Sequence, residues 1–113
     1  MDYQKQIDEF LQVAARQEYL AAIPSYMHDG LGAYIVHGQA PGTFLSAVIE
    51  NDLKTACRHA DDQNRHCLFH YANFFYNCAP GACWGYRGAI EHWRKIVKDD
   101  KEVQKRIAHL VDS

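Results

Sequence analysis

Four residues near the middle of the chain have side chains that bind transition metals: Cys57, His59, His66 and His70. His66 and His70 are four positions apart, which on a helix places two imidazoles on one face, as zinc binding requires. The sequence has neither paired Cys-x-x-Cys spacing nor a His-Glu-x-x-His motif, the marks of a dedicated zinc site. Histidines at the rim of the core are therefore the preferred interpretation. A metal-dependent enzyme or a zinc-stabilised domain built from these four residues is the alternative hypothesis.

Other polar residues resemble parts of catalytic motifs without completing one. The dipeptide His28-Asp29 resembles the metal-binding pair of HD-type phosphohydrolases, but those enzymes need a further upstream histidine, and no histidine precedes this one. The carboxylates of Glu50 and Asp52, or of Asp61 and Asp62, are too close in sequence to face one Mg²⁺ ion from a helix. We expect helix caps and solvated faces at these positions.

Cysteine chemistry is a third possibility. A nucleophilic thiol needs a pKa lowered by a nearby histidine or by a helix N-terminus. Cys83 follows a Pro-Gly turn and is the best placed of the four cysteines, yet the sequence supplies no base for it. We expect free thiols, with Cys78 and Cys83 as the pair to check for a disulfide. No complete catalytic set emerges, so the sequence predicts a protein that is not an enzyme and needs no cofactor or metal.

Aromatic residues are more numerous than one small core needs, with seven tyrosines, five phenylalanines and two tryptophans in 113 residues. Tyr and Trp are prominent among the residues that contribute most to protein interfaces. Trp84, in a loop rich in Pro and Gly and close to Tyr86, is the predicted exposed anchor. Three basic residues complete the predicted partner-binding site by orienting the partner: Arg87, Arg94 and Lys95. A homodimer interface would use the same chemistry.

Length, composition and charge limit the classes of protein. A chain of 113 residues with 48% hydrophobic residues is typical of one folded domain, so we predict a single helical domain over residues 1–113. No apolar run reaches the roughly 18 to 20 residues of a membrane span. The polar start is unlike a signal peptide, so we expect a cytoplasmic protein that does not enter the membrane. The net charge of −2 argues against nucleic acid as a partner.

The spacing of apolar residues predicts an all-α domain of five or six helices. Apolar residues recur every three or four positions over about 2–21, 24–37, 41–56, 62–76, 87–97 and 99–111. Gly38 is predicted to end the second helix, and Asn51-Asp52 to bend or split the third. The fourth helix is aromatic-rich and apolar all round, so we expect it to be central, with Phe69, Phe74 and Phe75 in the core. Breaker residues over 77–86 predict a loop that can include one helical turn.

Several short segments carry a resemblance to known proteins. They are Ile23-Pro24, Tyr34-Ile35-Val36-His37-Gly38, Pro41-Gly42-Thr43-Phe44-Leu45, Asn51-Asp52-Leu53, Ala60-Asp61-Asp62-Gln63-Asn64, Tyr76-Asn77-Cys78-Ala79-Pro80 and Cys83-Trp84-Gly85. Over about residues 23–93 the chain resembles a family of small, mostly uncharacterised helical proteins encoded by bacteriophages and prophages. The resemblance implies a biological context and no catalytic residue.

That context implies a mechanism based on shape. Small accessory proteins of phages often act by covering a surface of a host or phage protein, including components of bacterial defence systems. We therefore predict a non-catalytic protein-binding module in the cytoplasm of a bacterial host. Its partner is expected to be a host or phage protein, and the most specific form of this hypothesis is an anti-CRISPR-like inhibitor.

Overall fold

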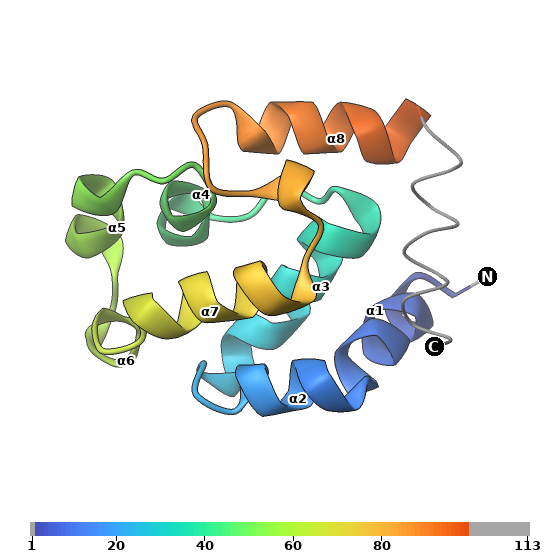
Figure 1. Cartoon of the computed structure of the whole chain (residues 1–113), viewed down its shortest axis with the longest axis horizontal. Helices are drawn as coiled ribbons and strands as arrows, with labels where there is room; N and C mark the ends of the chain where they lie inside the picture. Colours follow the sequence, from blue (N-terminus) through green and yellow to red (C-terminus); the bar gives the residue numbers. More distant parts are fainter. Residues whose placement is uncertain (1, 100–113) are drawn as a thin grey trace.

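The computed structural model describes residues 2–99, and every regular element in that range is helical (Figure 1). The elements are α1 (Tyr3–Gln12), α2 (Ala14–Leu20), η1 (Ser25–Met27), α3 (His28–His37), α4 (Thr43–Ile49), α5 (Leu53–His59), α6 (Asp62–Arg65), α7 (Leu68–Cys78), η2 (Gly81–Cys83) and α8 (Ala89–Asp99), where η marks a 3₁₀ turn. The all-α prediction is confirmed for these residues. None of these helices has the length and apolar character that crossing a bilayer requires.

The described residues form eight α-helices rather than five or six, because three of the expected helices are interrupted. Val13 is extended between α1 and α2, with φ −64° and ψ 130°. After α4, Asn51 adopts a left-handed conformation (φ 61°), which Asn tolerates at helix ends. Asp52 then caps α5, so the third expected helix is split where the sequence predicted a bend or a split. The expected helix over 99–111 lies outside the described residues except for Asp99.

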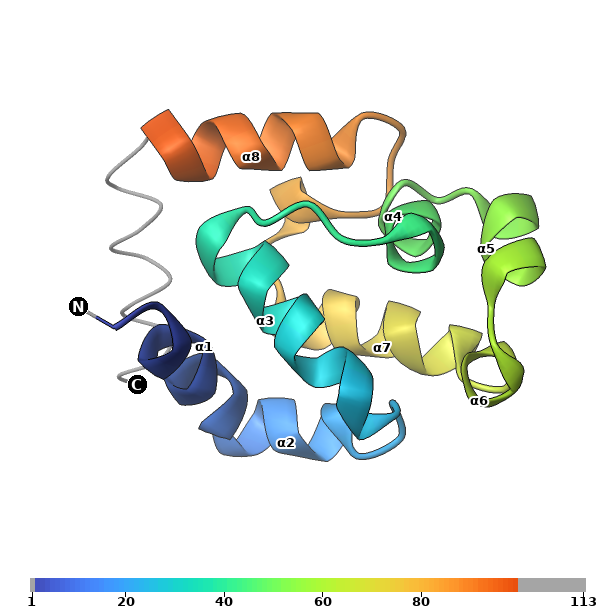
Figure 2. The same ribbon diagram turned by 180° about the vertical axis from the view of Figure 1, so that it is seen from behind.

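Helix α3 occupies the middle of the molecule and runs diagonally between α2 and α8 (Figure 2). Its Leu31 and Tyr34 side chains are fully buried. Gly32 allows α1 to pack closely, because a Cβ atom there would lie 2.7 Å from Cγ2 of Ile7. The helix ends at Gly38, whose φ of 68° is the left-handed conformation that favours glycine, so the predicted end of this helix is confirmed.

Helix α7 contributes aromatic side chains to the core from one face only. Tyr71, Phe74 and Phe75 are fully buried, and the rings of Phe44 and Tyr71 meet edge to face with centroids 5.4 Å apart. Phe69 is 73% exposed, so the prediction that it lies in the core is wrong. The expectation that this helix is central is not confirmed, because it packs against α2 and α4 and leaves Phe69, Ala72 and Tyr76 exposed.

Buried hydrogen bonds attach η2 and α8 to α3. The Tyr34 hydroxyl donates to the carbonyl oxygen of Cys83 at 2.7 Å. Nε1 of the buried Trp93 lies 3.2 Å from the carbonyl oxygens of both Tyr34 and Ile35. These contacts fix the segment between α7 and α8, which carries the predicted aromatic anchors.

Candidate protein-binding surface

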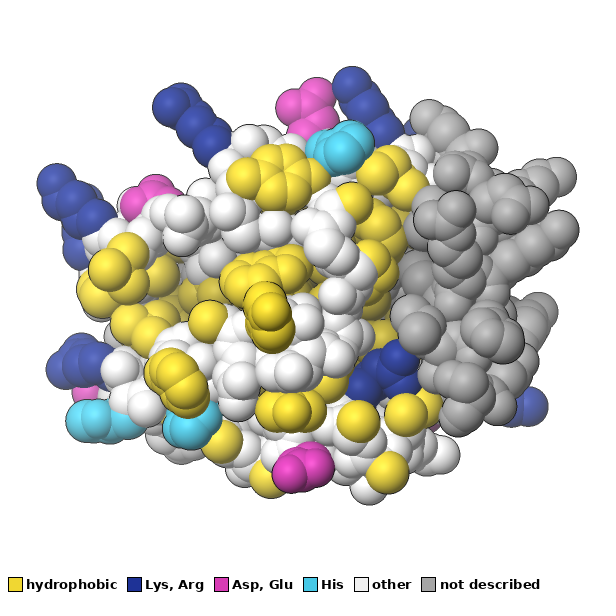
Figure 3. Space-filling model, in the orientation of Figure 1, with side chains coloured by type: hydrophobic (Ala, Val, Ile, Leu, Met, Phe, Trp, Pro, Cys, Tyr) yellow, Lys and Arg dark blue, Asp and Glu magenta, His cyan; other side chains and the backbone are white. Residues whose placement is uncertain are grey.

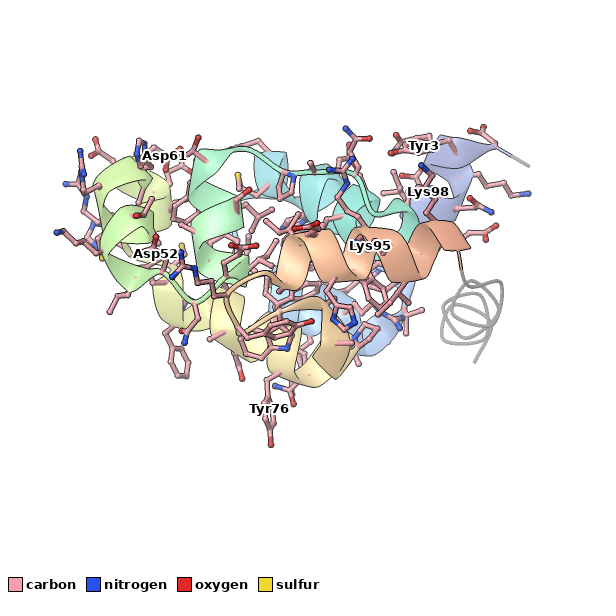
Figure 4. The ribbon with its side chains drawn as sticks, turned by 90° about the horizontal axis from the view of Figure 1, so that it is seen from above. Tyr3, Asp52, Asp61, Tyr76, Lys95 and Lys98 are labelled. Carbon is pink, nitrogen blue, oxygen red and sulfur yellow. The ribbon has the colours of Figure 1, made fainter. Side chains whose placement is uncertain are left out.

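Two large aromatic side chains of α7 point away from the core. Among the described residues, Phe69 and Tyr76 are the most exposed large hydrophobic side chains, at 73% and 79%. Tyr76 projects from the side of the molecule opposite Tyr3 and Asp61 (Figure 4). Seven residues make nearly two helical turns, so Phe69 and Tyr76 share one face of α7, with the exposed Ala72 between them. We call Phe69, Ala72 and Tyr76 the α7 stripe.

The spacing along α7 already contains a signal for this second face. Tyr71, Phe74 and Cys78 follow one another at intervals of three and four residues and are all buried. Phe69 and Tyr76 lie off that line and are seven residues apart. A helix that is apolar all round is either enclosed or has a second face to cover. The sequence pattern predicts an enclosed helix, whereas the structure leaves this second face of α7 exposed.

The predicted anchors Trp84 and Tyr86 are half-buried; Trp84 lies against α7, and Tyr86 contacts η2 and α8. The Trp84 ring stacks on Phe75, with centroids 5.5 Å apart and an interplanar angle of 20°. The Tyr86 hydroxyl donates to the carbonyl oxygen of Ala82, and its oxygen lies 2.6 Å from Nδ1 of His92. Burial raises the pKa of Tyr86, which keeps the hydroxyl protonated. Both rings are therefore held in fixed positions with part of each open to solvent.

These side chains belong to a surface with few charges. Figure 3 shows hydrophobic atoms over α7 and over the segment that leads to α8, while charged side chains lie mainly towards the margins of the view. Helix α7 itself contains no Lys, Arg, Asp or Glu. We call Phe69, Tyr76, Trp84 and Tyr86 the aromatic face. Large exposed apolar patches on folded proteins often mark binding sites.

The three predicted basic residues line two other hollows. Arg87 lines a polar cavity of about 860 Å³ together with Glu50. Arg94 and Lys95 line a groove of about 570 Å³ between α8 and the end of α3. Nζ of Lys95 also lies 3.7 Å from Oε1 of Glu91, one turn earlier on α8. Arg87, which directly follows Tyr86, and the pair Arg94 and Lys95 therefore line two different hollows.

The four residues of the metal hypothesis do not converge on one point. Cys57 and His59 are two positions apart on α5, so their side chains leave the helix in different directions. His66 ends α6 while His70 belongs to α7, so the two imidazoles do not share one helix face as expected. Within residues 2–99, no group of three or more His, Cys, Asp or Glu side chains is placed to hold a metal ion. The break between α6 and α7 is the physical reason that His66 and His70 do not form the expected pair.

The two candidate catalytic residues are held in structural surroundings. Nε2 of His28 lies 3.0 Å from the carbonyl oxygen of Leu20 and 2.9 Å from that of Ile23, so this ring closes the end of α2. Cys83 is fully buried, and burial raises the pKa of its thiol to about 12, the opposite of what a nucleophile needs. Cys78 and Cys83 are both free thiols.

Two of the four acidic residues that resembled Mg²⁺ ligands, Asp52 and Asp61, cap helices as expected. Asp52 accepts a hydrogen bond from the backbone N–H of Thr55 at 3.1 Å, and Asp61 accepts one from that of Asn64 at 2.7 Å. The Tyr26 hydroxyl also donates to Asp61, and this bond is the main cause that lowers the pKa of the Asp61 carboxyl and raises that of Tyr26 to about 12. Tyr26 and Asp61 line a shallow cavity of about 410 Å³.

Comparison of the chain with protein-family models, with curated proteins and with solved structures finds no match.

Proposed function

We propose that this protein is a non-catalytic protein-binding module that recognises its partner through the aromatic face. The observation that carries the proposal is the exposure of Phe69 and Tyr76, at 73% and 79%. Burial of a large apolar side chain is worth about 1.5–3 kcal/mol. Folding leaves these two rings exposed, so the free energy of burying them is gained only when a partner covers them.

The surroundings of Trp84 and Tyr86 support the same function. Trp84 is held by its stack on Phe75, and Tyr86 by hydrogen bonds to Ala82 and His92. A side chain that is ordered before binding loses little conformational entropy when a partner covers it. Tyr and Trp also combine a large apolar surface with a polar group, so this part of the face can both pack and form hydrogen bonds.

The basic residues Arg87, Arg94 and Lys95 contribute to the approach of a partner in this proposal. They lie outside the aromatic face, and charges near an interface act mainly on the association rate and on orientation. An acidic partner surface would therefore associate faster and with a stronger dependence on salt. The proposal requires no metal, cofactor or catalytic step.

The class of partner comes from the resemblance to phage and prophage proteins. We propose a protein of the bacterial host or of the phage, whose functional surface is covered by steric contact in the cytoplasm. An anti-CRISPR-like inhibitor is one form of this mechanism. Contact through a preformed aromatic face is sufficient for it.

Capture from a bacterial lysate, followed by mass spectrometry, tests this proposal. Wild-type protein should retain a partner, and the double variant Phe69→Ser/Tyr76→Ser should lose at least about tenfold in affinity, because two buried rings are removed. Trp84→Ala/Tyr86→Ala should also weaken capture. Tyr3→Ser is the matched control, since this ring is 47% exposed on the opposite side of the molecule. Retention of every partner by both double variants would contradict the proposed surface.

A further inference from the structure

We propose that the cavity lined by Tyr26 and Asp61 binds an organic cation, that is, an ammonium or guanidinium group on an apolar stem. A lysine or arginine side chain of another protein and a small free amine share this chemistry. The cavity lies between η1, the start of α4 and the start of α6. Figure 4 places Asp61 on the side of the molecule opposite Tyr76, so the site is separate from the α7 stripe and does not depend on the proposed function.

The sign of the charge in the cavity selects a cation. Asp61 forms no ion pair within the described residues, and neither Lys nor Arg lines the cavity in that part of the chain. The neighbouring Asp62 is already paired with Arg65, with oxygen and nitrogen 3.7 Å apart. The hydrogen bond from Tyr26 lowers the pKa of the Asp61 carboxyl, so this group is charged at neutral pH. An anionic ligand would meet a like charge that no Lys or Arg of the lining compensates.

Asp61 retains acceptor capacity for a ligand although it caps α6. Its Oδ1 accepts from the backbone N–H of Asn64, and its Oδ2 accepts from the Tyr26 hydroxyl. A carboxylate has about four acceptor positions, so the N–H groups of a bound cation can still reach it. Thr43 and His59 line the same cavity, and a hydroxyl and an imidazole can each accept a further hydrogen bond.

The rest of the lining selects an apolar stem. Four apolar side chains complete this part of the cavity: Met27, Pro41, Phe44 and Leu45. Phe44 and Leu45 are buried whereas Asp61 is exposed, so the cavity is apolar at its base and charged at its rim. A small hydrated metal ion gains nothing from such a base. The aliphatic stem of lysine or arginine packs on apolar surface while its charged end stays near water.

Tyr26 adds an aromatic surface beside the carboxylate. Its ring is 55% exposed, and its hydroxyl is held by the hydrogen bond to Asp61. The face of an aromatic ring attracts ammonium and guanidinium groups electrostatically. A cation that pairs with Asp61 can therefore also contact the ring of Tyr26.

Gly30 keeps the cavity open on the side of α3. This glycine lines the cavity, and a Cβ atom there would meet nothing within 4 Å. A leucine at this position should therefore occupy the space of the ligand stem without displacing a neighbouring side chain.

Chemical-shift mapping of the full chain by two-dimensional NMR tests the site with four probes. N-acetyl-lysine-N-methylamide, the corresponding arginine compound and n-butylamine carry the cation. N-acetyl-norleucine-N-methylamide has nearly the same stem as the lysine compound without its charge. The probes are titrated to about 10 mM, because ligands of at most about 16 non-hydrogen atoms bind in roughly the millimolar range.

The lysine and arginine probes should shift the amide signals of Met27, Gly30 and Asn64 with saturation. The norleucine probe should bind about five- to thirtyfold more weakly, because it lacks both the ion pair and the contact of a cation with the Tyr26 ring. Binding of n-butylamine as tight as that of the lysine probe supports the site and assigns it to amines in general. Weaker binding of n-butylamine supports the site and assigns it to a side chain of a polypeptide.

Asp61→Asn removes the charge and keeps a side chain that caps helices equally well. This variant should bind the lysine probe no better than the norleucine probe, with an unchanged circular dichroism spectrum. Asp52→Asn is the matched control, because Asp52 caps α5 in the same way but lines a different cavity. Gly30→Leu should also abolish binding of the lysine probe.

Three results overturn the inference. They are the absence of saturable shifts with every cationic probe, equal affinity for the lysine and norleucine probes, and unchanged binding by Asp61→Asn. Phe69→Ser/Tyr76→Ser should bind the lysine probe like the wild type while it loses the lysate partner. Loss of the probe in that double variant would place the cation on the aromatic face and overturn the assignment to this cavity.

Discussion

At the scale of single residues, the four thiols have different environments although the sequence presents them as equivalent. Cys78 and Cys83 are buried, and burial raises the pKa of both thiols, that of Cys83 to about 12. Cys57 is exposed on α5. Because the thiolate is the reactive form, burial protects Cys83 by limiting both ionisation and access.

Alkylation of the folded protein with iodoacetamide should therefore modify Cys57 first and leave Cys83 unmodified. At about pH 8, a thiol with a pKa near 12 is ionised to about one part in ten thousand. Peptide mass mapping after timed reaction measures the difference, and protein unfolded in urea, in which all four thiols should react, is the control. Equal modification of Cys57 and Cys83 in the folded protein would show that Cys83 is accessible.

At the scale of helices, two glycines of α3 have opposite surroundings. A Cβ atom on Gly32 would lie 2.7 Å from Cγ2 of Ile7 and 3.5 Å from Cγ of Leu11, both on α1. A Cβ atom on Gly30 would meet nothing within 4 Å. Gly32 is therefore needed for the packing of α1 on α3, whereas Gly30 only weakens the helix.

The substitutions Gly30→Ala and Gly32→Ala should consequently have effects of opposite sign. Gly30→Ala should raise the free energy of unfolding by up to about 1 kcal/mol, because Ala restricts the unfolded chain and favours helix. Gly32→Ala should lower it by about 1–3 kcal/mol, because α1 must move away. Equilibrium unfolding in urea measures both. Stabilisation by both substitutions would be incompatible with the close packing of α1 on α3.

The sequence was sufficient to predict helices and their approximate positions, because the spacing of apolar residues depends on local geometry. The split at Asn51-Asp52 was also predictable, since Asn adopts the left-handed conformation and Asp caps the next helix. The break at Val13 was not. Valine is no helix breaker, and its extended conformation results from how α1 and α2 each pack against the rest of the molecule.

The candidate surface was predictable only in part, for a related reason. Trp84 and Tyr86 stood out because breaker residues surround them in sequence. Phe69 was assigned to the core because an apolar side chain carries no mark of whether a neighbouring helix covers it. That depends on where α2 and α4 lie, which is a property of the tertiary structure.

At the scale of the whole molecule, Tyr34 links three distant parts of the chain. Its hydroxyl reaches the carbonyl oxygen of Cys83 in η2, and its own carbonyl oxygen lies 3.2 Å from Nε1 of Trp93 in α8. Burial raises the pKa of Tyr34 far above its ordinary value, so the hydroxyl stays protonated and remains a donor at neutral pH. Tyr34 thus links α3 to η2 through its side chain and to α8 through its backbone carbonyl.

Tyr34→Phe should lower the free energy of unfolding by about 1–3 kcal/mol, because it leaves the buried carbonyl of Cys83 without its donor. Tyr19→Phe is the matched control, since Tyr19 is half-buried and its hydroxyl forms no hydrogen bond within the described residues. Urea unfolding of the two variants gives the comparison. Equal stability of the two variants would mean that the Tyr34 hydrogen bond contributes nothing to the attachment of η2.

The two tryptophans give the molecule a pair of intrinsic fluorophores at different depths. Trp93 lies on α8 and is buried against α3, so its fluorescence emission should change when α8 detaches. Trp84 lies on Phe75 at the edge of the aromatic face, so its emission should respond to a bound protein while the interior stays intact. Replacing either indole with Phe would leave a single reporter, and occupancy of the surface could then be followed separately from opening of the fold.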